Sequence, residues 1–262
     1  MKEILKQLIR KDLKIRYARP TLGFFWAFLS PFLTSLVFYV VFGRILGIQI
    51  GPWPFFLYIT TALFPWRFLQ DSLMQATTSL LDNKNILKES PMPQALIPLS
   101  VVLTQGIVFL PSLMILALIS WWTTQKITPW IMLLPAVVIL HAAIIAGLAI
   151  SCAVLYVFWR DLKYLLEICL LVLFYSSPAF YALSAAKAAL PPALYRLFCL
   201  NPFTMILNLY RICLIPGFAD STEGLAIPKL FLGSALIAIV LLAIALGIHR
   251  HFKTKINDHL AY

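Results

Sequence analysis

The chain has 262 residues, of which 61% are hydrophobic and 12% charged, and its mean hydropathy is +0.90. These values exclude an ordinary soluble domain and predict an all-α polytopic membrane protein. A formal net charge of +11 would suggest nucleic-acid binding in a soluble chain. Here the basic residues stand at the ends of apolar runs, so we expect membrane lipids and no nucleic acid as partners.

Residues 1–22 predict an amphipathic helix that lies along a membrane surface. With 3.6 residues per turn, one face is apolar and consists of Ile4, Leu5, Leu8, Ile9 and Leu13. The opposite face is basic and consists of Lys2, Lys6, Arg10 and Lys14. Asp12 and Arg16 are four residues apart at the apolar edge, which predicts a mutual ion pair. Pro20 then ends the helix and Gly23 permits a turn. This segment is either a cationic anchor or a lever tied to a moving partner.

Six apolar runs approach the roughly 20 residues that a membrane-crossing helix needs. They lie near residues 24–43, 55–73, 96–122, 130–158, 164–183 and 230–248. An even number of crossings places both termini on one side of the membrane. The loops on that side carry more lysine and arginine than those on the other side, which makes it the cytoplasmic side. The outer loops would then hold Arg44, Lys126, Lys187, Arg196, Arg211 and Lys229. We expect one membrane domain over residues 1–262.

The cytoplasmic connection 82–94, DNKNILKESPMPQ, mixes charges with Ile86 and Leu87 before Pro91 and Pro93. A short polar helix with a small apolar ridge, stopped by prolines, suits docking in a groove of another protein. The alternative is a solvated loop.

The outer connection from Ser184 to Pro228 contains apolar pieces too short to cross a bilayer and too hydrophobic for water. Asn201 and Pro202 predict a helix start, and Pro216-Gly217 a stop. We therefore expect re-entrant gate helices over 184–217 that line or close a passage, since irregular backbone at that depth needs protein or water around it. The alternative is an interfacial cap without a gating role.

Polar groups inside the apolar runs are few. Arg67 and Asp71 can pair on one helical face, and His141 suits a hydrogen bond to a neighbouring helix better than a ligand role. Cys152, Cys169, Cys199 and Cys213 are expected to be small core residues. The sequence contains no HExxH, GxSxG or GxxxxGK[ST] motif, which argues against an intramembrane enzyme and against ATP hydrolysis by this chain.

Several motifs occur together and in order: RKDLKIRYARPTLGFFWAFLSP at 10–31, LFPWRF at 63–68, NILKESPMP at 85–93, LYVFWRDLKYLL at 155–166, SSPAFY at 176–181 and NPF at 201–203. Over nearly its whole length the chain resembles the membrane subunit of type-2 ATP-binding-cassette exporters for polysaccharides, which export O-antigen, capsule or teichoic-acid chains. Arg67 stands where that family more often carries an uncharged residue.

The resemblance implies a homodimer with six spans per copy in the bacterial cytoplasmic (inner) membrane. Two separate ATPase subunits would bind ATP and Mg, so this chain would hold no cofactor, no metal and no catalytic residue. A lipid-linked glycan would pass between the two copies.

The resemblance also implies roles for individual residues. The residues expected to couple to the ATPase are Asp12, Arg16, Asn85, Lys88, Glu89, Arg160 and Asp161. Those expected at the outer gate are Ser177, Pro178, Tyr181, Asn201 and Pro202. Because sugar rings stack on aromatic planes, the channel candidates are Trp26, Tyr39, Phe174 and Tyr175, each of which could equally be a packing or lipid-facing ring.

Three other functions compete with this one. An exporter of a small lipid or drug could share the architecture. A membrane-embedded glycolipid enzyme could use Asp161 and Glu167 near the membrane face, and would work without ATP. A passive channel would also be independent of ATP.

Overall fold

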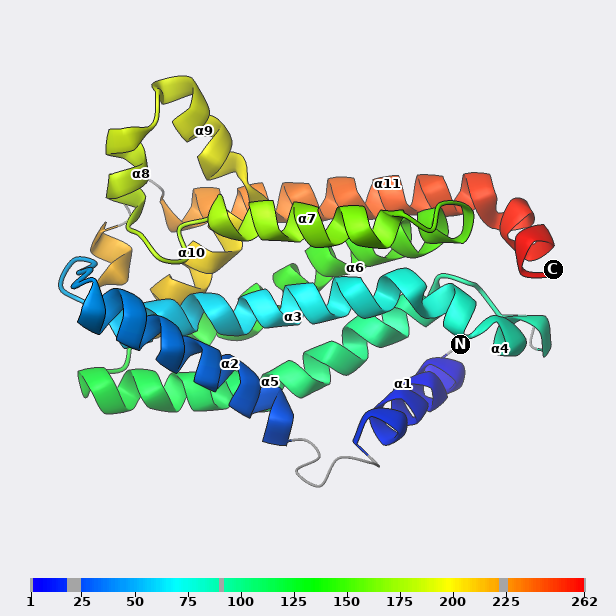
Figure 1. Ribbon diagram of the computed structural model, residues 1–262, viewed down its shortest axis with the longest axis horizontal. Helices are drawn as coiled ribbons and strands as arrows, with labels where there is room; N and C mark the ends of the chain where they lie inside the picture. Colours follow the sequence, from blue (N-terminus) through cyan, green and yellow to red (C-terminus); the bar gives the residue numbers. More distant parts are fainter. Residues whose placement is uncertain (1, 18–24, 90–91, 222–225, 262) are drawn as a thin grey trace.

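The computed structural model describes residues 2–17, 25–89, 92–221 and 226–261, and all regular structure in these ranges is helical (Figure 1). In chain order the elements are α1 (Lys2–Tyr17), α2 (Phe25–Phe38), the π-helix η1 (Tyr39–Ile45), α3 (Phe55–Asp82), α4 (Lys84–Glu89), α5 (Leu96–Thr124), the 3₁₀ helix η2 (Pro129–Leu133), α6 (Leu134–Phe158), α7 (Leu162–Tyr175), α8 (Leu183–Ala189), α9 (Pro192–Leu200), α10 (Pro202–Leu214), the 3₁₀ helix η3 (Phe218–Ser221) and α11 (Ile227–Ala261).

The bundle is built around α3 and α6. α6 packs against α11 and α3, and α3 packs against α5 and α2. At the α6–α11 contact, a Cβ added to Gly147 would lie 2.8 Å from the backbone carbon of Leu241. A glycine at this position therefore lets the two helices approach closely, as small residues do in membrane bundles.

Within the described ranges, three helical segments are long and apolar enough to cross a membrane, namely Leu96–Thr124, Pro129–Phe158 and Ile227–Lys253, and the bent pair α9–α10 could supply a fourth. α3 is long enough at 28 residues but contains Arg67 and Asp71, and α7 has 14 residues, a length of about 21 Å. The chain is thus a polytopic helical protein, and six crossings stay a prediction.

The two ends of the bundle differ in character (Figure 1). α1, α4 and the last turns of α11 gather at one end, and α8, α9 and α10 at the other. At the α1 end a small apolar cluster joins α1, α3, α5, α6 and α11, with Leu8, Leu80, Met92, Ile97, Val154, Val157 and Ile256 among its buried members. The predicted apolar face of the first helix is confirmed by the burial of Leu8 there. Pro20 and Gly23, the predicted helix stop and turn, lie outside the described residues.

Candidate functional site

The end of the bundle opposite α1 is organised by α10, which begins where the sequence predicts. Asn201 caps the helix, its Oδ1 accepting a hydrogen bond from the backbone N–H of Phe203 at 2.9 Å, and Pro202 occupies the first turn. The chain leaves α10 at Ile215 and turns at Gly217, whose φ is +76°. The predicted helix start and stop are confirmed.

α9 and α10 meet at a bend of 70° and differ completely in burial. Every residue of α10 from Phe203 to Leu214 is buried, whereas α9 has no buried residue. α10 packs against α11, η2, α3 and α6, while the main helix contacts of α9 are with α10 and α8. One half of the bent pair therefore belongs to the core and the other lies on its outside.

α10 is hydrogen-bonded to the non-helical segment 176–182 that follows α7, which we call the break after α7. Ser177 donates to the carbonyl of Leu173 at 2.7 Å, and the Asn201 amide Nδ2 donates to Ser177 Oγ at 3.0 Å. Ser177 is buried and Asn201 half-buried. Two residues assigned to the outer gate from separate motifs thus contact each other directly.

The strongest feature of this region is Arg211, a residue of α10 with 0% exposure. Its Nη1 donates to the hydroxyl of Tyr58 and to the carbonyl of Pro178, each at 2.7 Å. Its Nη2 donates to the carbonyls of Ala179 at 3.2 Å and Tyr58 at 3.4 Å, and the guanidinium carbon lies 3.4 Å from the centroid of the Tyr58 ring. Arg211, counted among the basic residues of the outer loops, is instead a buried residue of α10, the helix predicted to begin at Asn201; its place on the outer side stays a prediction.

Neutral groups hold this cation. Among the residues that the structure describes, no carboxylate lies within ion-pair distance of Arg211, and Nε has no hydrogen-bond partner there. A charged side chain in hydrocarbon costs about 3 kcal/mol or more unless its donors are satisfied, so the carbonyls of the break and the face of Tyr58 take the place of water. Tyr58 extends the network by donating to the carbonyl of Tyr181 at 3.0 Å.

A second buried polar contact is made by Tyr210, the residue next to Arg211 in α10. His141 of α6 has its Nδ1 3.4 Å from the hydroxyl of Tyr210 on α10, and its ring meets those of Phe68 and Tyr210 edge-on. The expected hydrogen bond to a neighbouring helix is confirmed. It links α10 to α6.

The candidate channel aromatics are not equivalent in their surroundings. Trp26 is 47% exposed and Tyr175 57% exposed, whereas Phe174 is 7% exposed and packs on Trp66 and Phe180, with ring centroids 4.8 and 5.0 Å away. Tyr39 of η1 is half-buried and lies beside Phe56. Of the four, Trp26 and Tyr175 have the ring surface to meet a passing molecule.

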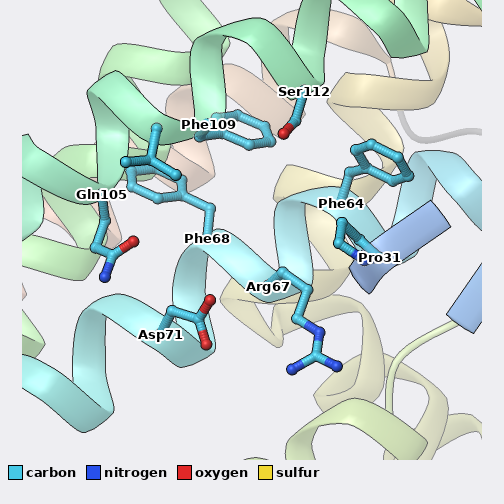
Figure 2. A pocket seen from close by; sticks show the side chains of 9 residues that line it. Pro31, Phe64, Arg67, Phe68, Asp71, Gln105, Phe109 and Ser112 are labelled. Carbon is cyan, nitrogen blue, oxygen red and sulfur yellow. The ribbon is translucent and has the colours of Figure 1, made fainter. Parts of the chain in front are cut away.

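A small polar cavity of about 40 Å³ lies between α2, α3 and α5. Figure 2 shows its lining, with Arg67 and Asp71 one helical turn apart on α3 and Gln105 on the facing helix. Gln105 is buried, and its Nε2 has no partner among the described groups. The cavity has room for one or two waters, which would hydrate these groups, and direct pairing of Arg67 with Asp71 stays a prediction.

At the opposite end, the short polar helix expected within 82–94 is confirmed as α4. Asn85, Lys88 and Glu89 are exposed, while Ile86 and Leu87 pack on the apolar cluster that holds α1. The apolar ridge therefore turns toward the bundle and leaves a polar face outward. Arg160 and Asp161 are exposed at the turn between α6 and α7.

α1 is tied to the end of α3 by polar contacts. Lys11 Nζ donates to Asn83 Oδ1 and lies 3.8 Å from a carboxylate oxygen of Asp12. Burial raises the pKa of the Asp12 carboxyl, although Lys11 beside it acts in the opposite direction. These side chains line a cavity of about 470 Å³ between α1, α3 and α5. The side chain of Arg16 lies outside the described residues, so its pairing with Asp12 stays a prediction.

Long apolar helices, a buried cation held by carbonyls and a bent helix pair at one end are typical of a multi-pass membrane protein. The chain belongs to the ABC-2 type transporter family, because its residues 3–215 match the sequence pattern of that family. Members of this family are transport subunits without catalysis of their own, and separate ATPase subunits hydrolyse ATP.

Three relatives are described as O-antigen export system permease protein RfbA. One from Klebsiella pneumoniae is 27% identical over 240 residues, covering 86% of this chain and 90% of the relative. A second from the same organism is 30% identical over 182 residues, 69% of each chain. One from Myxococcus xanthus is 28% identical over 208 residues, covering 79% of this chain and 78% of the relative.

Proposed function

We propose that this chain is the transmembrane subunit of an exporter that moves a lipid-linked polysaccharide across the bacterial cytoplasmic membrane. One observation carries the proposal, namely the similarity to O-antigen export permeases at 27–30% identity over 69–86% of the chain. The exposed rings of Trp26 and Tyr175 support it, because aromatic planes offer apolar faces to sugar rings along a path.

In this proposal two copies of the chain form the channel, and each copy crosses the membrane six times with both termini in the cytoplasm. The shared location of α1 and the end of α11 supports an even number of crossings (Figure 1).

Two ATPase subunits would bind ATP and Mg and seat on the α4 end of the bundle. The exposed polar face of α4, with Asn85, Lys88 and Glu89, supports this, as do the exposed Arg160 and Asp161. α1 would transmit the movement of the ATPases, because Lys11 joins it to α3. The break after α7 and the bent pair α9–α10 would form the outer gate.

The proposal is tested by reconstituting the permease in lipid vesicles with its partner ATPase and measuring ATP hydrolysis with and without lipid-linked glycan. We expect glycan to stimulate hydrolysis. A carrier lipid without sugars serves as control, because an exporter of small lipids would respond to it equally. Stimulation by neither molecule would contradict the proposal, and glycan turnover without ATP would favour the enzyme.

A further inference from the structure

The outer gate contains one part that is fixed to the bundle. α10 is buried along its whole length, and Arg211 binds it at once to α3 through Tyr58 and to the break after α7 through the carbonyls of Pro178 and Ala179. Moving any one of these three elements away would leave a buried guanidinium with unsatisfied donors in an apolar surrounding. We call α10 together with residues 176–182 the post.

The other part is attached loosely. α8 and α9 (Leu183–Leu200), here called the flap, have a single buried residue, Ala186, between them. A ring contact joins the flap to the post, between Phe198 and Tyr181, whose centroids lie 6.2 Å apart. Elements with few buried contacts open at low free-energy cost, and moving parts are drawn from such elements.

Flap and post meet at Asn201, where the helix axis bends by 70°. Both hydrogen bonds of the Asn201 side chain are made on the post side, to the backbone of Phe203 and to Ser177. The junction residue is therefore anchored in the post, and α9 can rotate at this point without breaking those bonds.

We propose that Arg211 is a positioning residue that holds the post still while the outer gate opens by rotation of the flap about Asn201. This inference rests on the proposed export function for the meaning of the gate. It assigns opposite behaviour to two native thiols, because Cys199 lies on the flap and is half-buried whereas Cys213 lies on the post and is buried.

The test uses the full-length permease with its ATPase in vesicles, in two variants that keep either Cys199 or Cys213 and carry serine at the other cysteines. A membrane-impermeant maleimide is added on the outer side, and labelling rates are measured without nucleotide and during ATP turnover. We expect turnover to change the rate at Cys199 about tenfold and to leave Cys213 protected, because a water-soluble reagent reaches only hydrated thiols.

In the Cys213-only background, we expect Arg211→Gln to raise labelling without nucleotide by about tenfold, because the carbonyls of the break lose their donors. Arg211→Lys should give an intermediate rate, since it keeps the charge and loses the planar fork. Arg196→Gln on the exposed side of α9 is the matched control and should change nothing. Tyr58→Phe, which removes one hydroxyl, should also raise the labelling rate of Cys213, but by less than Arg211→Gln. This variant keeps the test decisive if Arg211→Gln fails to fold.

Labelling of Cys213 during turnover with Arg211 intact would overturn the proposal. An unchanged labelling rate of Cys199 during turnover would overturn it too. So would a Cys213 that stays protected in the folded Arg211→Gln and Tyr58→Phe variants. Glycan stimulation of ATP hydrolysis is measured in the same vesicles. The nucleotide-free labelling does not depend on the cargo, so loss of glycan stimulation with the expected labelling would reject the export function and retain the post.

Discussion

Replacing Tyr58 by phenylalanine measures how strongly the Arg211 network stabilises the end of the bundle that contains α10. The hydroxyl accepts from Arg211 at 2.7 Å and donates to the carbonyl of Tyr181 at 3.0 Å. A hydrogen bond to a charged group contributes about 1.5–3 kcal/mol and a neutral one about 0.5–1.5 kcal/mol. We therefore expect Tyr58→Phe to lower the free energy of unfolding by about 2–4.5 kcal/mol, the sum of the two.

Tyr181→Phe is the matched control, because it removes the same atom from a half-buried ring whose hydroxyl donates to the Tyr175 carbonyl at an exposed position. Its cost should be about 1 kcal/mol or less. Thermal unfolding of the purified protein, followed with a thiol-reactive fluorophore, should give a Tm about 5–15 °C lower for Tyr58→Phe. Equal losses for the two variants would refute the special role of the Arg211 contact.

Three further predictions concern other parts of the chain. Gly147→Ala should destabilise the α6–α11 contact, because the new methyl meets the Leu241 backbone at 2.8 Å, whereas Gly247→Ala, with nothing within 4 Å, should be neutral in the same melting assay. Since burial raises the pKa of Asp12, the folded state binds its proton more tightly than the unfolded state, so stability falls as pH rises from the usual carboxylate pKa through the raised one. Asp12→Asn should flatten that part of the Tm-against-pH curve, and an unchanged curve would contradict it. Exchanging the charges of α4, Lys88→Glu with Glu89→Lys, should weaken capture of the ATPase in a pull-down without changing Tm, and full capture with full export would exclude α4 as the docking element.

Much of the helical order follows from local patterns in the sequence. Apolar runs predict α5, α6 and α11, the pair Asn201-Pro202 predicts the start of α10, and the prolines after Glu89 predict a short α4. Each of these signals acts within a few residues, through chain length, capping or the loss of a backbone donor. Local patterns do not say which face of a helix meets which neighbour.

The position of Arg211 shows why the rest could not be predicted. Its four acceptors belong to residues that lie 33, 32 and 153 positions away in the chain, and three of them are backbone carbonyls that no residue type reveals. One signal was present, because a lone arginine in the apolar stretch MILNLYRICLI fits a buried helix with an internal partner better than a loop. The same limit applies to Phe174 and Tyr175, adjacent aromatic residues of which one is buried and the other exposed.

The acceptors of Arg211 also bear on how the protein is assembled. α3 and the break after α7 precede α10 in the chain, so a ribosome completes Tyr58, Pro178 and Ala179 before it completes Arg211. The guanidinium can leave water at low cost only when those groups are already in place to accept its hydrogen bonds. Integration of α10 therefore depends on earlier segments having packed, and a variant that delays the packing of α3 should leave α10 outside the bundle, where quality-control proteases can cut it.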